Sequence, residues 1–384
     1  MSRPEPIDVL IPVYNGAATV HEAIDSIQRQ TFADFRMIVV NDGSTDGTAN
    51  ILADMQAGDP RISVVTQVNG GIVDALNHGI EHCTAEFIAR HDADDVAYPE
   101  RFEKQIAYLR ANPDCVAVSN AVRQIDADGA PTDTIARYDS PELADPTRIP
   151  SKEPYLLHPF VLMRRWAVQK VGGYRYAFHA EDTDLYWRLR EVGRLHNLDD
   201  VLGDYRVHAQ SISSRSIVNG RIAALYSQLA GISALRRQAG REDVVFEKAS
   251  IGRLNAAKSL EEVFKIGSAG LDERERWQLE ISLAAKMLEA SSYRSYELEP
   301  EDCGYIGRVI SRHTDLDGSN RHMVDWHAAD AAARLIRTGS FSSGIGLLPP
   351  RLYRKASVRL GFRMIPRALR RKIRSWSGRQ GYLK

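Results

Sequence analysis

Three aspartates lie within four residues of one another, at the point where an apolar run ends. Residues 86–89 predict a short buried strand, and Asp92, Asp94 and Asp95 follow it almost directly. Carboxylates this close repel one another, so such a cluster is stable mainly when it binds a cation. Oxygen ligands of this kind suit Mg²⁺ or Mn²⁺. The alternative is an acidic, solvated loop that leads into a helix.

The elements that must position these aspartates alternate between strand and helix. β-rich runs at 7–13, 35–40, 62–65 and 86–89 are separated by segments with apolar residues at helical spacing, at 20–27, 49–55 and 72–80. This alternation predicts βαβ units and an α/β fold with a mainly parallel sheet. Polar motifs follow the first, second and fourth strands. We therefore expect them along the carboxyl edge of the sheet, where open α/β sheets bind ligands.

The known nucleotide and calcium motifs do not account for these loops. The turn after the first strand lacks GxGxxG, and no GxxxxGK[ST] segment occurs in the chain. The turn from Asp42 to Gly47 resembles the start of a calcium loop. Its twelfth position is Ala53, where such a loop needs a bidentate glutamate, so a calcium loop is excluded.

Composition indicates a globular protein in a reducing compartment. The 384 residues are 43% hydrophobic and 26% charged, and the three cysteines are scattered with no CxxC pair. We expect neither a disulfide framework nor a zinc site, and a cytoplasmic location. The start of the chain shows no apolar signal segment, and no run of 18 apolar residues occurs, so we expect no transmembrane helix.

Five motifs of the chain resemble those of glycosyltransferase family 2. They occur in the order of that family over residues 7 to about 214. They are PVYNG at 12–16, NDGSTDGT at 41–48, RHDADD at 90–95 with the helix PERFEKQIAYL at 99–109, GGYRYAFHAEDTDLYWRLREVG at 172–193, and YRVH at 205–208 with nearby serines. The resemblance implies a GT-A fold, in which a nucleotide-sugar donor and a divalent metal bind across a Rossmann-like sheet.

The resemblance also implies roles for individual residues on the donor side. Asp94 would bind the Mn²⁺ or Mg²⁺ directly, with Asp95 and His208 as further candidate ligands. The donor nucleotide would contact Pro12, Tyr14, Asn15, Asp42 and Asp92. The metal would act as a Lewis acid and neutralise the charge that develops on the departing nucleotide diphosphate. The alternatives are a packed aromatic for Tyr14, a turn-forming residue for Asp42 and a structural histidine for His208.

On the acceptor side, an inverting transfer needs a base for the proton of the attacking hydroxyl. By resemblance, this base is Asp182. Three further residues are weaker candidates for contacts with the acceptor or the diphosphate: Glu181, His158 and Arg206. Asp182 could instead stabilise the first turn of the helix that follows it, and Arg206 could form a structural salt bridge.

The rest of the chain predicts helices and a basic end. We expect a catalytic domain at 1–215, a helical C-terminal region at 216–345 and a basic amphipathic tail at 346–384. The net charge is zero, but residues 331–384 carry 14 Lys and Arg and no Asp or Glu. Large apolar side chains are interleaved with these charges, which suits an in-plane helix on an anionic membrane surface. A disordered solubilising tail and a nucleic-acid patch are the alternatives.

Taken together, the sequence predicts a metal-dependent, inverting glycosyltransferase at the inner face of the plasma membrane. A UDP-sugar is the favoured donor, and the acceptor would be a glycan or a lipid-linked glycan of surface polysaccharide biosynthesis. Neither the QxxRW segment nor the transmembrane helices of processive synthases occur, so we expect a non-processive enzyme. The alternative is a non-catalytic protein that binds membrane or, less favoured, nucleic acid through its basic tail.

Overall fold

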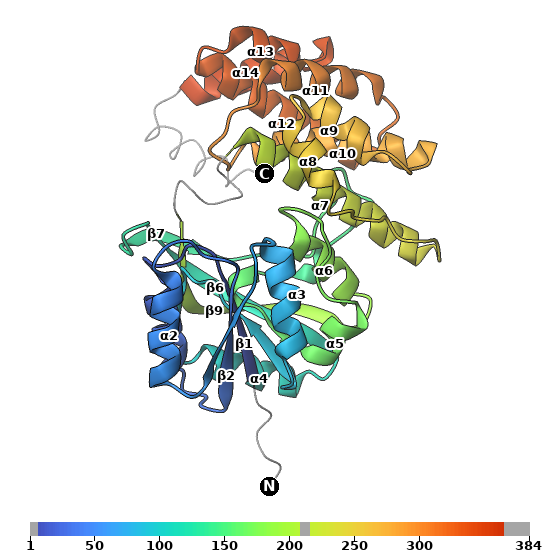
Figure 1. Ribbon diagram of the computed structural model, residues 1–384. Helices are drawn as coiled ribbons and strands as arrows, with labels where there is room; N and C mark the ends of the chain where they lie inside the picture. The colour runs from blue at the N-terminus through green and yellow to red at the C-terminus, as the bar shows by residue number, and fades with distance from the viewer. Residues whose placement is uncertain (1–6, 208–215, 365–384) are drawn as a thin grey trace. The chain divides into compact units, whose positions relative to one another are not determined.

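The computed structural model describes residues 7–207 and 216–364, and a mixed nine-stranded sheet forms its first part (Figure 1). The strand order is β3-β2-β1-β4-β8-β6-β9-β5, and β7 pairs with β6 off this path. The strands are β1 (Ile7–Val13), β2 (Phe35–Asn41), β3 (Ile62–Thr66), β4 (Phe87–Arg90), β5 (Val96–Ala97), β6 (Cys115–Ile125), β7 (Pro131–Ala136), β8 (Leu162–Arg164) and β9 (Arg194–Arg206).

The first four strands are parallel, as the alternation of strands and helices predicts. β1 pairs with β2 and with β4, and β2 pairs with β3, all in the parallel sense. Val13 at the end of β1 is in register with Asn41 at the end of β2, and Leu10 is in register with Arg90 at the end of β4. The loops that leave these three strands therefore emerge along one edge of the sheet.

The second half of the sheet is mixed. β8 is antiparallel to both β4 and β6, whereas β6 and β9 are parallel to each other. β5, which directly follows the aspartate loop, pairs antiparallel with β9. This pairing places the acidic loop between the end of β4 and the end of β9.

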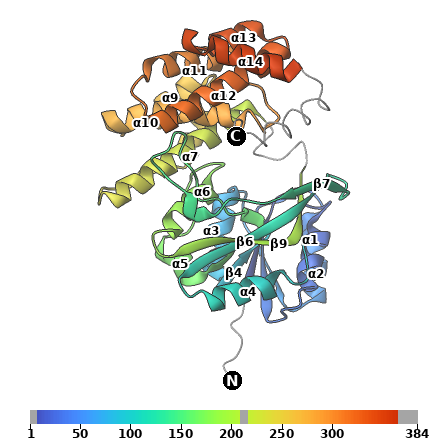
Figure 2. The ribbon, with the colours of Figure 1, turned by 180° about the vertical axis from the view of Figure 1, so that it is seen from behind.

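Helices cover both faces of the sheet (Figures 1 and 2). The core of one face contains apolar residues of α1 (Val20–Gln28), α2 (Thr48–Gly58) and α4 (Arg101–Ala111). The core of the other face contains residues of α3 (Ile72–His82), α5 (Arg165–Lys170) and α6 (Glu181–Leu189). The predicted stripe of α1 is fully buried at Val20, Ala23, Ile24 and Ile27. Burial of such apolar faces supplies most of the stability of helices of this length.

The remaining chain is helical, as the apolar spacing beyond residue 220 predicts. Its helices are α7 (Ile217–Gln238), α8 (Ser250–Ala256), α9 (Leu260–Gly267), α10 (Glu273–Ala290), α11 (Pro300–Arg312), α12 (Gly318–Arg337), α13 (Phe341–Gly346) and α14 (Tyr353–Met364). Three short 3₁₀ helices complete the described residues, at Pro141–Leu143, His158–Phe160 and Pro350–Leu352. The stripe residues Ile222, Leu225, Leu229 and Ile232 of α7 are buried.

The chain divides into two compact units. The first contains Met1–Pro146, Lys152–Ser211 and Ser233–Lys248, and the second contains Thr147–Ser151, Ile212–Ile232 and Ala249–Lys384. The change from one unit to the other falls inside α7. The segment after it returns to the first unit, where Asp243 forms ion pairs with Arg175 and Arg237.

Candidate active site

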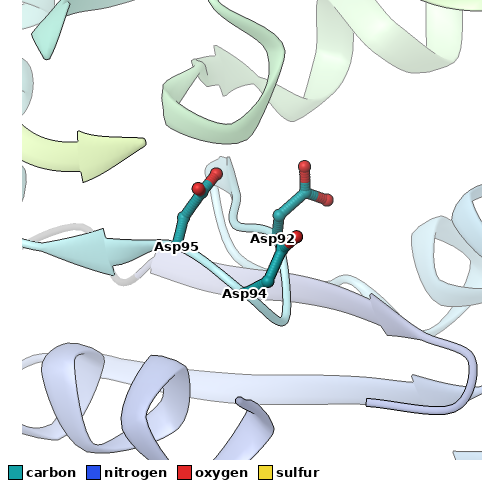
Figure 3. Close-up of side chains that lie close together, drawn as sticks. All are labelled: Asp92, Asp94 and Asp95. Atoms are coloured by element: carbon teal, nitrogen blue, oxygen red, sulfur yellow. The ribbon is translucent and has the colours of Figure 1, made fainter. Parts of the chain in front are cut away.

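The three aspartates of the acidic loop lie close enough to share one cation. One carboxylate oxygen from each of Asp92, Asp94 and Asp95 lies within 4.8 Å of the others. The three side chains extend from one loop toward the same side of it (Figure 3). Burial and the charges of Asp94 and Asp92 raise the pKa of Asp95 well above its usual value. A divalent cation at this place would relieve that repulsion, so this loop could hold a metal.

Two arginines hold the loop in place. Nη2 of Arg90 lies 2.5 Å from Oδ1 of Asp92 in an ion pair. The backbone N–H of Arg206 donates a 2.8 Å hydrogen bond to Oδ1 of Asp95. The second oxygen of Asp95, Oδ2, is buried and has no hydrogen-bond partner among the described residues. Oδ2 is therefore the oxygen with which Asp95 could bind a metal.

Arg206 uses its side chain to hold the surrounding loops. Nε donates to the carbonyl of Asp94 at 2.8 Å, and Nη2 lies 2.6 Å from a carboxylate oxygen of Glu22 in α1. Nη1 donates to the carbonyls of Asp126 and Ala127 at 3.3 and 3.1 Å. All three nitrogens are thus engaged within the protein, which favours the structural salt bridge over a phosphate contact.

The loops that follow β1 and β2 are joined by side-chain hydrogen bonds. The backbone N–H of Asn15 donates to Oγ of Ser44 at 3.0 Å, and Oδ1 of Asn15 accepts from the N–H of Thr45 at 2.8 Å. Tyr14 next to it is half exposed. Pro12 lies within β1. Asn15 has a φ of 52°, a strained value for a residue other than glycine, and such strain tends to occur at functional sites.

Asp42 binds the segment that leads into α3. Oδ1 accepts from Nε2 of Gln67 at 2.7 Å and from the N–H of Gly70 at 2.8 Å, and Oδ2 accepts from the N–H of Gly71 at 2.9 Å. A carboxylate oxygen has two lone pairs, so only Oδ2 retains capacity for a nucleotide base. Asp42 is more than the turn-forming residue considered above.

Glu181 and Asp182 form the first turn of α6. Burial, followed by the charge of Asp182, raises the pKa of Glu181 to about 7. Burial also raises the pKa of Asp182, although the N–H of Thr183 donates to its Oδ1 at 2.7 Å and opposes this rise. Oε2 of Glu181 is buried without a hydrogen-bond partner among the described residues. A buried carboxylate with a raised pKa is suited to accept a proton at neutral pH.

An ion-pair network beneath this turn fixes the direction of α6. Asp184 is fully buried and binds Nε of Arg175 at 2.9 Å and Nη2 of Arg188 at 2.7 Å. Nη1 of Arg188 also donates to the carbonyls of Val171 and Gly173, at 2.6 and 2.7 Å. Asp184 therefore holds the helix in place, and Glu181 and Asp182 precede it on the same helix.

Of the two candidate histidines, His158 lies among the described residues and His208 does not. His158 is buried, and its Nε2 lies 2.7 Å from the hydroxyl of Tyr174. Burial and the charge of Arg90 hold the pKa of His158 well below its usual value, so its imidazole is neutral. His208 lies outside the described residues.

Sequence reasoning missed Arg90 as a member of this site. Its guanidinium charge acts on Asp92, on Glu181 and Asp182, and on the buried Tyr174, which lie far apart in the sequence. The signal was a charged residue at the end of an otherwise apolar strand, next to the acidic run.

Comparison with known proteins shows which family has this arrangement. Residues 8–172 match the family described as Glycosyl transferase family 2. The amylovoran biosynthesis glycosyltransferase AmsE of Erwinia amylovora is 31% identical over 54% of this chain and 78% of its own length. The O-antigen biosynthesis glycosyltransferase WbnJ of Escherichia coli is 31% identical over 55% and 83%. The chain belongs to glycosyl transferase family 2.

Membership in family 2 confirms the enzyme class predicted from the sequence. The chain is a glycosyltransferase that uses a nucleotide-sugar donor, and a non-catalytic binding protein is not favoured. The crystal structure of S. aureus TarS residues 1–349 with UDP-GlcNAc matches with a TM-score of 0.52 at 16% identity, over 91% of this chain and 92% of that one. This likeness confirms the GT-A fold. Among the described residues, no helix is long and apolar enough to span a membrane.

Proposed function

We propose that this family 2 enzyme is metal-dependent and inverting. The observation that supports this proposal is the acidic loop, where Asp92, Asp94 and Asp95 come within 4.8 Å of one another. The cluster lies at the carboxyl edge of the sheet, where a donor would bind. Mn²⁺ or Mg²⁺ would be held by Asp94 and by Oδ2 of Asp95. The metal, when bound, supplies Lewis-acid neutralisation of the departing nucleotide diphosphate.

The loops after β1 and β2 would bind the nucleoside. Tyr14 presents a half-exposed ring on which a base could stack, and Oδ2 of Asp42 can accept one more hydrogen bond. Asn15 would contribute through the loop that it holds together with Ser44 and Thr45. A UDP-sugar is the favoured donor, in line with the UDP-GlcNAc bound by S. aureus TarS.

Asp182 would act as the general base. Its carboxylate would take the proton from the acceptor hydroxyl as the hydroxyl attacks the anomeric carbon, and the configuration at that carbon would invert. Glu181 would contact the acceptor, and His158 would support this side through Tyr174. The acceptor would be a glycan or a lipid-linked glycan. The relatives AmsE and WbnJ, named for amylovoran and O-antigen biosynthesis, support a role in surface polysaccharide assembly.

Calorimetric titration of UDP and GDP, with Mn²⁺ and then with EDTA, tests the donor site. We expect one nucleotide to bind with Mn²⁺ and to lose at least tenfold in affinity with EDTA. Asp94→Ala should bind that nucleotide equally weakly in both conditions. Asp200→Ala is the matched control. Asp200 is an exposed residue of β9 that pairs with Lys104, and it lies outside the acidic loop. Metal-independent binding by the wild type would contradict the metal proposal.

The basic end of the chain would attach the enzyme to the inner face of the plasma membrane. Leu352 and Ala356 are buried, and Arg351 and Lys355 form ion pairs with Asp325 of α12, so the start of α14 belongs to the helical region. Residues 365–384 lie outside the described residues, and the attachment is expected from their basic and apolar composition. Truncation after residue 364 should abolish sedimentation with phosphatidylglycerol vesicles and leave Mn²⁺-dependent nucleotide binding unchanged. Equal sedimentation of both proteins would contradict this attachment.

A further inference from the structure

Arg90 is a buried arginine with nitrogen atoms to spare. Only 5% of its side chain is exposed, and Nη2 is held by Asp92 at 2.5 Å. Nε and Nη1 are buried and have no hydrogen-bond partner among the described residues. An arginine N–H that is removed from water without a partner costs free energy. Two such donors on one fixed guanidinium indicate a group that binds when the enzyme is loaded.

The backbone directs this side chain toward the reacting groups. Side chains alternate between the two faces of a strand, so Arg90 shares a face with Ile88. Ile88 packs in the core that contains Leu185 and Leu189 of α6. The guanidinium therefore lies on the side of the sheet that α6 covers, and α6 begins with Glu181 and Asp182.

Further unpartnered polar atoms accompany Arg90 on this side. Oε2 of Glu181 and the hydroxyl of Tyr186 are both buried without a hydrogen-bond partner among the described residues. Glu181 and Tyr186 belong to α6, and the charge of Arg90 acts on both of them. The set thus offers two N–H donors, a carboxylate acceptor, and a hydroxyl that can donate or accept.

The balance of charge limits what kind of group can bind there. Asp92 is ion-paired with Arg90, and Glu181 and Asp182 begin the helix on the same side of the sheet. The buried guanidinium of Arg101 also lies close, because its Nη2 donates to the carbonyl of Arg90 at 2.7 Å. The neighbouring carboxyl groups disfavour an anion at Nε and Nη1, and the guanidinium groups disfavour a cation. A neutral group with several hydroxyls fits, because each hydroxyl can both accept from Arg90 and donate to a carboxylate.

We propose that Arg90 is a specificity-determining residue that donates hydrogen bonds from Nε and Nη1 to ring hydroxyls of the donor sugar, beside the carboxylate of Asp92. This inference rests on the proposed donor site. Asp92 belongs to the loop that would hold the metal and the diphosphate, and the sugar of a nucleotide sugar is attached to that diphosphate. The ring next to Asp92 is therefore assigned to the donor.

This arrangement would discriminate between sugars by their hydroxyl pattern. A hydroxyl that is missing or inverted leaves a buried arginine N–H without an acceptor. Sites built to hydrogen-bond a hydroxyl reject analogues that lack it far more strongly than apolar pockets reject a missing methylene. Arg90 would therefore act on the sugar and leave the nucleotide unaffected.

The test compares nucleotide and nucleotide-sugar affinities in Arg90→Lys and Arg90→Gln. The wild type is first titrated, in the presence of Mn²⁺, with UDP-glucose, UDP-galactose, UDP-GlcNAc and GDP-mannose. The donor that binds is then used with its own nucleotide diphosphate. We expect the ratio of the two dissociation constants, nucleotide over nucleotide sugar, to fall roughly tenfold or more in both variants, because two charged hydrogen bonds are lost. Affinity for the nucleotide itself should change less than threefold.

A second variant and a control keep the test independent of folding. Tyr186→Phe removes only a hydroxyl without a protein partner, so the fold should be retained while the same ratio falls at least threefold. Arg164→Lys is the matched control, since Arg164 on β8 donates to the carbonyls of Cys115 and Leu109 and pairs with Phe87 at the far end of β4. Its ratio should remain that of the wild type.

Three outcomes would overturn the proposal. An unchanged ratio in the Arg90 variants would show that Arg90 does not contact the sugar. An unchanged ratio with a raised KM for the acceptor would assign the ring to the acceptor. Equal loss of nucleotide and nucleotide-sugar affinity, with a wild-type circular dichroism spectrum, would show that Arg90 only holds Asp92. If the wild type bound none of the four donors, the proposed donor site itself would fail.

Discussion

Asp95 and Arg206 are joined through the main chain, because the N–H of Arg206 donates a 2.8 Å hydrogen bond to Oδ1 of Asp95. The two residues are separated by 111 positions, and the bond connects the acidic loop to the end of β9. The side chain of Arg206 then reaches over the loop to the carbonyl of Asp94. The position of the candidate metal ligands therefore depends on β9.

Arg206→Gln should destabilise the protein. The substitution removes donors from the carbonyls of Asp94, Asp126 and Ala127 and breaks the ion pair with Glu22, so we expect a loss of roughly 3 kcal/mol in the free energy of unfolding. Urea denaturation measures it. Glu22→Gln is the control: Glu22 is 55% exposed, so its loss should cost less than about 1 kcal/mol. Wild-type stability of Arg206→Gln with weakened diphosphate affinity would indicate a phosphate contact.

Asp182→Asn should separate chemistry from binding. An amide cannot take the proton of the acceptor hydroxyl, so turnover should fall by about 10²-fold or more while Mn²⁺-dependent nucleotide affinity stays within threefold. Transfer from a radiolabelled nucleotide sugar measures the first quantity and calorimetry the second. Near-normal turnover in this variant would show that another group is the base.

Asp184→Asn should destabilise the protein strongly, although Asp184 is not assigned a contact with the substrate. Asp184 is fully buried between Arg175 and Arg188, and removal of its charge leaves Arg188 without its counter-ion and Arg175 with Asp243 alone. Breaking a buried ion pair in this way costs about 3–5 kcal/mol. Denaturant unfolding should show this loss, whereas Asp200→Asn, at an exposed pair with Lys104, should lose less than about 1 kcal/mol. Similar losses in the two variants would show that the network does not hold α6.

Glu181→Gln should change how stability depends on pH. The folded-state pKa of Glu181 is about 7, above its ordinary value of 4.5, so the folded protein binds more protons than the unfolded chain between these values. Stability from this group is therefore present below about pH 4.5 and is lost as pH rises to about 7. Relative to the wild type in EDTA, the variant should gain stability over that window, by up to about 3 kcal/mol. A pH-independent difference between the two proteins would contradict the raised pKa.

Local patterns in the sequence determined the first half of the sheet. The helical stripe of Val20, Ala23, Ile24 and Ile27 and the β-rich runs beside it depend on contacts within a few residues, so their period identifies the elements. The succession of these elements predicted parallel strands with the aspartate loop at their carboxyl edge. The ordered motifs of family 2 extended this prediction to Asp182, and the comparisons confirmed the family and the fold.

Only the tertiary structure decided what these side chains contact. β8 has three residues and lies between β4 and β6, a pairing that no local period encodes because its partners are about 45 to 75 residues away. Arg90 was recognisable as a charge at the end of an apolar strand. Packing against α6 decides that its Nε and Nη1 have no partner among the described residues, and on which face of the sheet its side chain lies. In the same way, the raised pKa of Glu181 is a consequence of burial, which the order of residues by itself does not determine.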